Sequence, residues 1–287
     1  DVEEIAVISR EYMNKVQFLF AGGFIIALAI QKWGLHKRVA LNILKFSGLN
    51  SQGIVASFMV ASAVLSMWVM NTSTAIMLLP VGISVIKVIT ETVSDITDNQ
   101  KFNFQLCLLL GIAYAASVGG IATPIGTSPN GVLIQFASNN YDYDIGFANW
   151  ISIGLPITLG LGPIIWIFLT RIIFPVNFSA TQESKDKLNS MLKELGPMSN
   201  EEKKVIVVFL ITAFFWIFRQ LIDNLPGLAL LDDSVIAISG AVSLFFIKER
   251  TNKNKLLIWD DVQNVFPWGL IFLFGGGMAL AFVVNDS

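Results

Sequence analysis

The sequence consists of long apolar stretches without charge, separated by short polar segments. Uncharged apolar arms at residues 53–70 and 75–86 flank four consecutive amide and hydroxyl side chains at residues 71–74 (Asn-Thr-Ser-Thr). A second uncharged interruption, rich in glycine and proline, covers residues 117–130 and also lies between apolar stretches. Because unpaired polar groups inside a bilayer cost several kcal/mol each, residues 71–74 predict either a turn that reaches water or a polar pocket inside the membrane.

The presence of two such interruptions favours the pocket. Glycine and proline at this density end a helix, and backbone freed inside a membrane is tolerated only where it lines a cavity or packs against protein. Paired interruptions are typical of the binding sites of secondary transporters. We therefore expect residues 47–90 to form a helical hairpin with its tip at residues 71–74, and residues 102–137 to form one broken helix.

The remaining apolar stretches are expected to cross the membrane at residues 16–30, 147–173, 205–222, 235–247 and 265–284. All 19 Lys and Arg residues except Arg10, Lys15 and Arg219 then lie on or near the cytoplasmic side. Asp223, Asp232 and Asp233 mark an outer turn, and a basic interfacial helix follows the first crossing, with His36 solvated among its lysines and arginines. This asymmetry supports the topology, but it does not decide between a re-entrant hairpin and two full crossings.

Composition sets the class of protein. The chain has 287 residues, of which 54% are hydrophobic and 14% charged, and its mean hydropathy is +0.66, so it is expected to be a multi-pass protein of the cytoplasmic (inner) or plasma membrane. A net charge of -2 gives no argument for nucleic acid as a partner. No constellation of His, Cys and carboxylate residues suggests an enzyme, so we name no catalytic residue. The single cysteine, Cys107, is expected in the core.

Three motifs resemble the divalent anion/sodium symporter family, the carriers of dicarboxylates, citrate and sulfate. The family's Ser-Asn-Thr signature at a hairpin tip appears here as Met70, Asn71 and Thr72, and its Gly-Thr-Pro-Pro-Asn loop appears at residues 126–130 (Gly-Thr-Ser-Pro-Asn). Residues 20–38 are similar to the family's helix before the hairpin. Each motif alone is weak, but their combination is specific, and the resemblance runs from about residue 16 to the end of the chain.

The resemblance implies an all-α polytopic membrane protein with inverted repeats, a re-entrant helical hairpin and a broken transmembrane helix. Asn71 and Thr72 would hold a substrate carboxylate, and Thr127 and Asn130 would shape the loop beside it. Such neutral donors, together with the N-terminal ends of half-helices, bind an anion in the membrane without a costly fixed charge.

The resemblance also implies a site for Na⁺ as the co-transported ion. Ser66, Asn71 and the backbone around Met70 and Gly126 would surround it, which suits the preference of hard cations for oxygen ligands. Met70 departs from the serine that the family has at this position. The backbone carbonyl is still available, so the substitution affects the expected sodium affinity more than the existence of the site.

We expect four functional parts: residues 1–46 as scaffold helix and interfacial segment, 47–174 as transport-domain elements, 175–204 as cytoplasmic linker, and 205–287 as scaffold helices with the start of a second repeat. The family's scaffold is dimeric, so a homodimer is expected.

An internal match supports the second repeat. Residues 18–27 align without gaps on residues 272–281 with six identities in ten positions, and the two segments run through the membrane in opposite directions on the expected topology. At this offset the counterpart of Asn71 falls beyond residue 287, so the sequence resembles a fragment that lacks the N-terminal helices and most of the second repeat.

The expected function is sodium-coupled import of C4-dicarboxylates such as succinate, malate or fumarate by alternating access. A sulfate or tricarboxylate symporter and a sodium-independent dicarboxylate exchanger are alternatives, although the short linker leaves no room for the large soluble insertion of some sulfate-type relatives. An anion channel is the alternative from another class, but no filter motif is present. The polypeptide as given could also transport nothing by itself because half of its site is missing.

Overall fold

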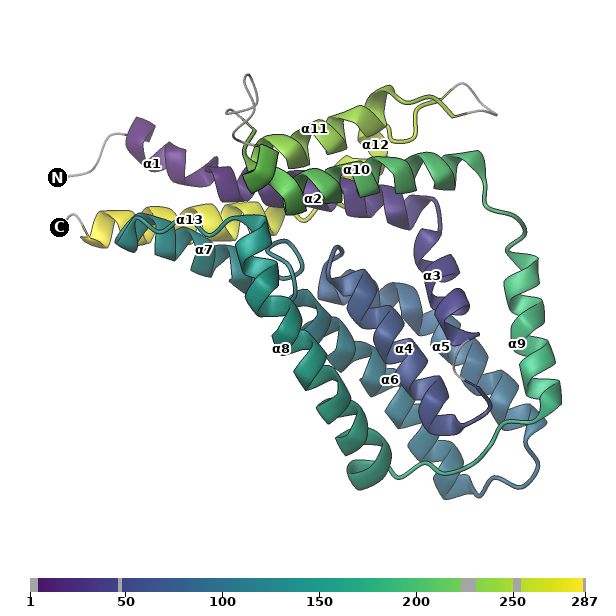
Figure 1. Cartoon of the computed structure of the whole chain (residues 1–287). Helices are drawn as coiled ribbons and strands as arrows, with labels where there is room; N and C mark the ends of the chain where they lie inside the picture. The colour runs from purple at the N-terminus through teal and green to yellow at the C-terminus, as the bar shows by residue number, and fades with distance from the viewer. Residues whose placement is uncertain (1–4, 46–47, 223–230, 250–253, 286–287) are drawn as a thin grey trace. The chain divides into compact units, whose positions relative to one another are not determined.

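The computed structural model describes residues 5–45, 48–222, 231–249 and 254–285 (Figure 1). Every regular element in these residues is a helix, which confirms the predicted all-α class. The helices are α1 (Ile5–Tyr12), α2 (Lys15–Lys32), α3 (Leu35–Leu44), α4 (Ser51–Ser66), α5 (Asn71–Thr92), α6 (Asp98–Gly120), α7 (Ser128–Tyr141), α8 (Phe147–Ile167), the π-helix η1 (Phe168–Ile173), α9 (Gln182–Glu194), α10 (Asn200–Ile222), α11 (Asp233–Phe246), α12 (Trp259–Gln263) and α13 (Trp268–Asn285).

The chain divides into two compact units. Unit 1 comprises Asp1–Ala29, Gly131–Ala148 and Lys203–Ser287, and unit 2 comprises Ile30–Asn130 and Asn149–Glu202. All residues predicted to bind substrate or sodium belong to unit 2. The assignment of scaffold and transport-domain roles stays a prediction.

The predicted hairpin is present as α4 and α5, and both helices pack against α6 (Figure 1). Residue 47, its predicted start, lies outside the described residues. Small residues let these helices approach closely, since a methyl group added to Gly119 of α6 would lie 2.5 Å from the Cα of Ala63 in α4. Leu78 of α5 and Phe104 and Leu108 of α6 are fully buried in the resulting core.

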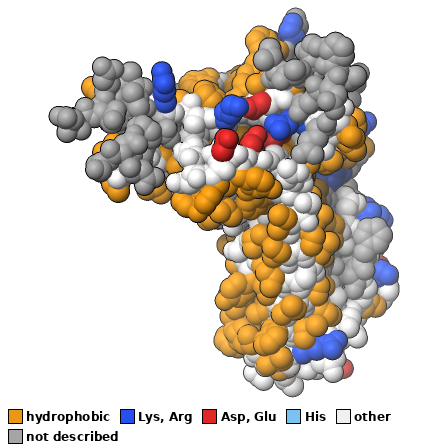
Figure 2. Space-filling model, turned by 60° about the vertical axis from the view of Figure 1, so that its left-hand side comes forward, with side chains coloured by type: hydrophobic (Ala, Val, Ile, Leu, Met, Phe, Trp, Pro, Cys, Tyr) orange, Lys and Arg blue, Asp and Glu red, His pale blue; other side chains and the backbone are white. Residues whose placement is uncertain are grey.

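Four helices in the described part of the chain are long and apolar enough to cross a membrane, namely α2, α5, α6 and α8 continued by η1. Along α8 and η1 only 11% of the most apolar window is buried inside the protein. Figure 2 shows hydrophobic side chains gathered over a continuous part of the molecular surface. A face this apolar has the character of one that contacts lipid rather than water.

Cys107 of α6 is buried, as predicted for a core residue. Its Sγ lies 3.2 Å from the carbonyl oxygens of both Leu169 and Phe174, at the two ends of the irregular turn formed by η1. The thiol therefore contacts the backbone carbonyls of the π-helical turn that continues α8.

The segment predicted as a linker is hydrogen-bonded to the residues where the first helix of the hairpin, α4, begins. The N–H of Ser51 donates to the carbonyl of Phe178 at 3.0 Å, and the N–H of Ala180 donates to the carbonyl of Leu49 at 2.6 Å. Further along, the Ser184 hydroxyl at the start of α9 lies 2.6 Å from the Thr92 hydroxyl at the end of α5. The segment that leads into α9, and α9 itself, thus bind both ends of the hairpin.

The prediction of a solvated His36 is wrong. α3 forms as predicted, but His36 is only 6% exposed because it lies on the face of α3 that also carries the buried Leu35. Burial, followed by the charge of Lys37, lowers the pKa of His36 from its ordinary value. Its basic neighbours misled the prediction, since a helix can turn basic residues outward while it buries the residue beside them.

A buried ion pair joins α3 to the start of α10. The Arg38 Nε donates to a carboxylate oxygen of Glu202 at 2.8 Å, and the Arg38 Nη1 donates to the carbonyl of Gly196 at 3.0 Å. Burial alone would raise the pKa of the Glu202 carboxyl, but the hydrogen bonds and charge of Arg38, with those of Ser199, bring the pKa below its ordinary value. The carboxylate is therefore held in its charged form.

In unit 1, the close contact of α2 with α11 again depends on a glycine. A methyl group on Gly22 would lie 2.5 Å from the carbonyl carbon of Ala237. Asp233 at the start of α11 accepts a hydrogen bond from the N–H of Phe147 at 2.8 Å and pairs with Arg219 at 3.5 Å. Asp223, predicted in the same outer turn, lies outside the described residues.

We predict that Gly119→Ala destabilises the protein by about 1–3 kcal/mol, because the added methyl group collides with the backbone of α4. Thermal unfolding of the purified protein in detergent measures the effect. The matched control is Gly160→Ala on α8, where no atom lies within 4 Å of the added methyl group and better helix propensity makes the change neutral or slightly stabilising. Equal melting temperatures for the two variants would contradict the close packing of α4 and α6.

The Arg38–Glu202 pair predicts a pH-dependent stability. Because the folded protein lowers the pKa of Glu202, the pair stabilises the fold above the unfolded value of 4.5, and this contribution is lost as the pH falls through the lower folded pKa. Arg38→Gln should cost about 2 kcal/mol near neutral pH, and progressively less as the pH falls below 4.5 toward the folded pKa of Glu202. Melting temperatures at several pH values test this. The exposed pair of Lys187 with Glu183 serves as control, since Lys187→Gln should cost under about 0.5 kcal/mol.

Candidate functional site

The turn of the hairpin consists of four residues between α4, which ends at Ser66, and α5, which begins at Asn71. The sequence analysis placed the tip at residues 71–74, but these residues form the first turn of α5 instead. The N–H of Thr74 donates to the carbonyl of Met70 at 2.9 Å, which is the first bond of the helix. Amide and hydroxyl side chains are common in a first helical turn because its N–H groups lack partners within the helix.

The predicted break in the second helix is confirmed and is shorter than expected. α6 ends at Gly120 and α7 begins at Ser128, so residues 121–127 are non-helical where the sequence indicated 117–130. Ile125 and Gly126 in this segment are buried. The backbone groups freed there therefore need partners inside the protein.

Side chains supply these partners. Asn130 is 6% exposed, and its Nδ2 donates to the carbonyls of Gly120 at 2.9 Å and Thr123 at 2.8 Å. From α8, the Thr158 hydroxyl donates to the carbonyl of Val118 and the Trp150 Nε1 donates to the carbonyl of Ile121, both at 2.9 Å. The end of α6 is thus capped by three side chains rather than by water.

The two interruptions meet at the Asn71 side chain. Its Oδ1 accepts a hydrogen bond from the Ser66 hydroxyl at 2.7 Å, and its Nδ2 lies 3.4 Å from the Thr127 hydroxyl. When the amide is rotated by 180°, its nitrogen lies 3.0 Å from the carbonyl oxygen of Ala116 and 3.3 Å from that of Gly126. The hairpin and the break therefore contribute oxygens to one cluster, formed by Ser66, Asn71, Ala116, Gly126 and Thr127.

This cluster can be satisfied chemically in two ways. With the amide nitrogen turned inward, Asn71 donates to Ser66, Ala116 and Gly126. With the amide oxygen turned inward, four oxygens face one another, and only one of them, the Ser66 hydroxyl, carries a proton to donate. Such a set of neutral oxygens fits a small hard cation, and no side chain of the cluster carries a charge. The described residues contain no group of three His, Cys, Asp or Glu side chains that could hold a metal ion instead.

The start of α5 provides the features expected for an anion. Met70 occupies the N-cap position and makes no capping hydrogen bond with its side chain. The N–H groups of the first turn are therefore not covered by a capping side chain from Met70, and the positive end of the helix dipole lies beside them. The exposed side chain of Thr72 lies in this turn. Six of the predicted site residues thus lie at or next to the meeting point of the hairpin and the break: Ser66, Met70, Asn71, Thr72, Gly126 and Thr127. The seventh, Asn130, supports the break through its hydrogen bonds to the carbonyls of Gly120 and Thr123.

Sequence reasoning missed one oxygen of the cluster and two side chains that cap the end of α6. The carbonyl of Ala116 belongs to an ordinary helical residue and gives no signal in the sequence. Thr158 and Trp150 lie on α8, and nothing in the sequence links them to the end of α6. Gly120 has a signal in the Gly-Gly pair at the end of α6, since a methyl group there would collide with the Oδ1 of Asn71.

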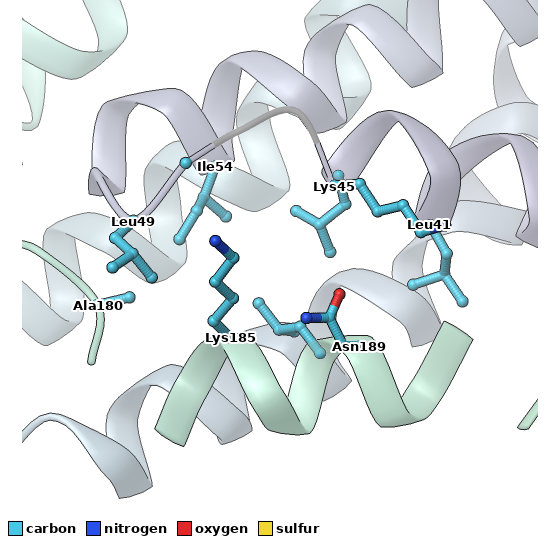
Figure 3. Close-up of a pocket in the computed structure, with 10 residues that line it drawn as sticks. Leu41, Lys45, Leu49, Ile54, Ala180, Lys185 and Asn189 are labelled. Atoms are coloured by element: carbon cyan, nitrogen blue, oxygen red, sulfur yellow. The ribbon is translucent and has the colours of Figure 1, made fainter. Parts of the chain in front are cut away.

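A separate cavity in unit 2 shares no residue with the cluster. It lies between α3, the start of α4 and α9, and the side chain of Lys185 reaches into it from α9 (Figure 3). Its volume of about 30 Å³ accommodates little more than water, and much of its lining is apolar, with Leu41, Leu49 and Ile54 among the lining residues. This cavity is therefore too small to be the candidate site.

Comparisons with known proteins identify the family of the chain. The family model described as the sodium:sulfate symporter transmembrane region matches residues 2–287. A sodium-dependent dicarboxylate transporter, SdcS, of Staphylococcus saprophyticus is 37% identical over 283 residues, and SdcS of Staphylococcus aureus strain USA300 is 36% identical over 285. These alignments cover 98% of this chain but 54% of each relative, so the chain spans about half the length of the curated relatives it matches.

We predict that Asn130→Ala destabilises the protein by about 2 kcal/mol, because two buried carbonyls lose a donor. Thermal unfolding in detergent measures the loss. Asn140→Ala on α7 is the matched control, since its exposed amide bonds only to the carbonyl of Phe136 one turn earlier, and it should change little. If both variants melt together, the Asn130 amide does not support the break.

Proposed function

Because this chain belongs to the family defined by the sodium:sulfate symporter transmembrane region, we propose that it forms part of a transporter that imports C4-dicarboxylates together with sodium. Membership in the family confirms two predictions from the sequence, that the chain belongs to an integral multi-pass membrane protein and that this protein is not an enzyme. The single observation that carries the proposal is the meeting of the hairpin and the broken helix at Asn71.

Sodium is proposed to bind among the oxygens around Asn71. Ser66 supplies its hydroxyl, Asn71 its amide oxygen, and Gly126 its carbonyl, while the carbonyl of Met70 lies next to them in the chain. The inward atom of the Asn71 amide lies 2.7 to 3.3 Å from the oxygens of Ser66, Ala116 and Gly126, which supports this assignment because a cation there would replace the hydrogen bonds that these oxygens otherwise need. Binding then requires the Asn71 amide to turn its oxygen inward.

The dicarboxylate is proposed to bind at the start of α5. The hydroxyl of Thr72 and the amide nitrogen of Asn71 would donate to one carboxylate, with help from the N–H groups of the first turn. Thr127 lies beside Asn71, and Asn130 keeps its loop in place. Sodium binding requires the Asn71 amide to turn its oxygen toward the cluster, and this orientation turns the amide nitrogen toward the anion. Sodium would therefore bind first and prepare the amide for the carboxylate.

The absence of charged side chains in the cluster makes the two ligands depend on each other. An anion buried among neutral donors is costly unless cations lie beside it, and the same holds for the cations. Each sodium ion that moves inward contributes about 2.3 kcal/mol per 100 mV of membrane potential. Coupled entry of both ligands by alternating access would therefore permit accumulation of the dianion. A homodimer is proposed on the resemblance alone.

Dicarboxylate is preferred over sulfate as the substrate on two grounds. The relatives described above are named dicarboxylate transporters. In addition, the segment between η1 and α10 is short and holds one helix, α9, and thus no large soluble insertion. The family description names sulfate, so sulfate stays the alternative to test.

Uptake by proteoliposomes tests the proposal. Labelled succinate should enter when sodium is outside and should enter at least tenfold more slowly with potassium, whereas labelled sulfate should not. Asn71→Ala should reduce uptake to background because it removes both an oxygen for the cation and a donor for the anion. Ser117→Ala is the matched control, since the exposed Ser117 hydroxyl on α6 bonds only to the carbonyl of Ala113. Uptake that ignores sodium and survives Asn71→Ala would refute the proposal.

A further inference from the structure

Thr123 occupies the middle of the break between α6 and α7 and is fully buried. Its hydroxyl donates to the carbonyl of Met67 in the turn of the hairpin. Its own carbonyl accepts hydrogen bonds from the Nδ2 of Asn130 at 2.8 Å and from the N–H of Gly126 at 3.3 Å. One residue is thus bonded to the hairpin turn, to the loop at Gly126 and to the start of α7.

This position matters because the oxygens of the candidate cation site come from the same two segments. Ser66 precedes the turn that contains Met67, and Gly126 follows Thr123 by three residues. A methyl group on Gly126 would lie 2.9 Å from the carbonyl oxygen of Ser66, so the two segments are in direct contact there. The hydrogen bond from the Thr123 hydroxyl to the carbonyl of Met67 joins the break to the hairpin turn, and it is separate from the cluster around Asn71.

We propose that Thr123 is a positioning residue that fixes the spacing of the sodium ligands by tying the break to the hairpin turn. The inference rests on the proposed function, since it assumes that the cluster binds sodium. Thr123 is not counted among the proposed ligands, because its oxygens are not part of the cluster formed by Ser66, Asn71, Ala116, Gly126 and Thr127. Its effect acts through the separation of the Ser66 hydroxyl and the Gly126 carbonyl, to which a small cation is sensitive.

The proposal predicts a change in sodium affinity rather than in stability alone. In Thr123→Val the shape of the side chain is kept and the hydrogen bond to Met67 is lost. The sodium concentration for half-maximal binding should then rise about tenfold, the change expected when one hydrogen bond no longer holds the ligands in place. Thr123→Ser keeps the hydroxyl and should stay within twofold of the unmodified protein.

The experiment measures the melting temperature of the purified protein while sodium replaces potassium at constant ionic strength, which reports binding without transport. Thr158→Val is the matched control. Like Thr123, Thr158 is buried and its hydroxyl donates to a backbone carbonyl, but that carbonyl belongs to Val118 of α6, so the bond does not join the break to the hairpin. It should lower the melting temperature and leave the sodium midpoint unchanged. Should Thr123→Val fail to fold, Thr123→Cys, which retains a weak donor, should show an intermediate rise in the midpoint.

Each outcome has one meaning. A raised midpoint in Thr123→Val, with normal midpoints in Thr123→Ser and Thr158→Val, supports the inference. A normal midpoint in Thr123→Val, or an equal rise in Thr158→Val, overturns the inference and leaves the proposed function intact. If sodium does not stabilise the unmodified protein at all, the proposed cation site is wrong and the inference falls with it.

Discussion

The fold of unit 2 depends on satisfying the backbone where α6 stops. A helix that ends inside an apolar environment leaves carbonyls without partners, and each costs several kcal/mol if it stays unpaired. Here Asn130, Thr158 and Trp150 donate to the carbonyls between Val118 and Thr123. Two of these donors, Thr158 and Trp150, come from α8, so the end of α6 depends on contact with a helix that follows the break. The interruption is therefore a property of the tertiary structure as well as of its glycines and prolines.

Close approach and neutrality follow from the same constraint. Glycines at 119, 120 and 126 let α4, α5 and the break come within contact distance, which places the oxygens of Ser66, Asn71 and Gly126 together. Fixed charges in so tight a cluster would need partners for which there is no space. An uncharged cluster that concentrates carbonyl, amide and hydroxyl groups is thus the arrangement compatible with this packing.

The sequence predicted the helices, the hairpin and the break because each has a local signal, either apolar length or a cluster of glycine, proline and polar residues. It placed Asn71 beside the second interruption through the family motifs. It did not predict that residues 71–74 begin α5, since polar residues are typical of a turn and of a first helical turn alike. It also missed the carbonyl of Ala116 and the burial of His36, because both depend on which face of a helix meets another element.

Met70 illustrates how a small departure from the family pattern changes the chemistry. A serine at this position could bond to the exposed N–H groups at the start of α5, as N-cap residues commonly do, and would stabilise the helix by about 1 kcal/mol. Methionine cannot do so, which leaves the first turn of α5 without a capping hydrogen bond from the side chain of its N-cap residue. A carboxylate that binds there would accept hydrogen bonds from these N–H groups. The solute would then act as the N-cap of α5 and make the hairpin tip that binds it more rigid.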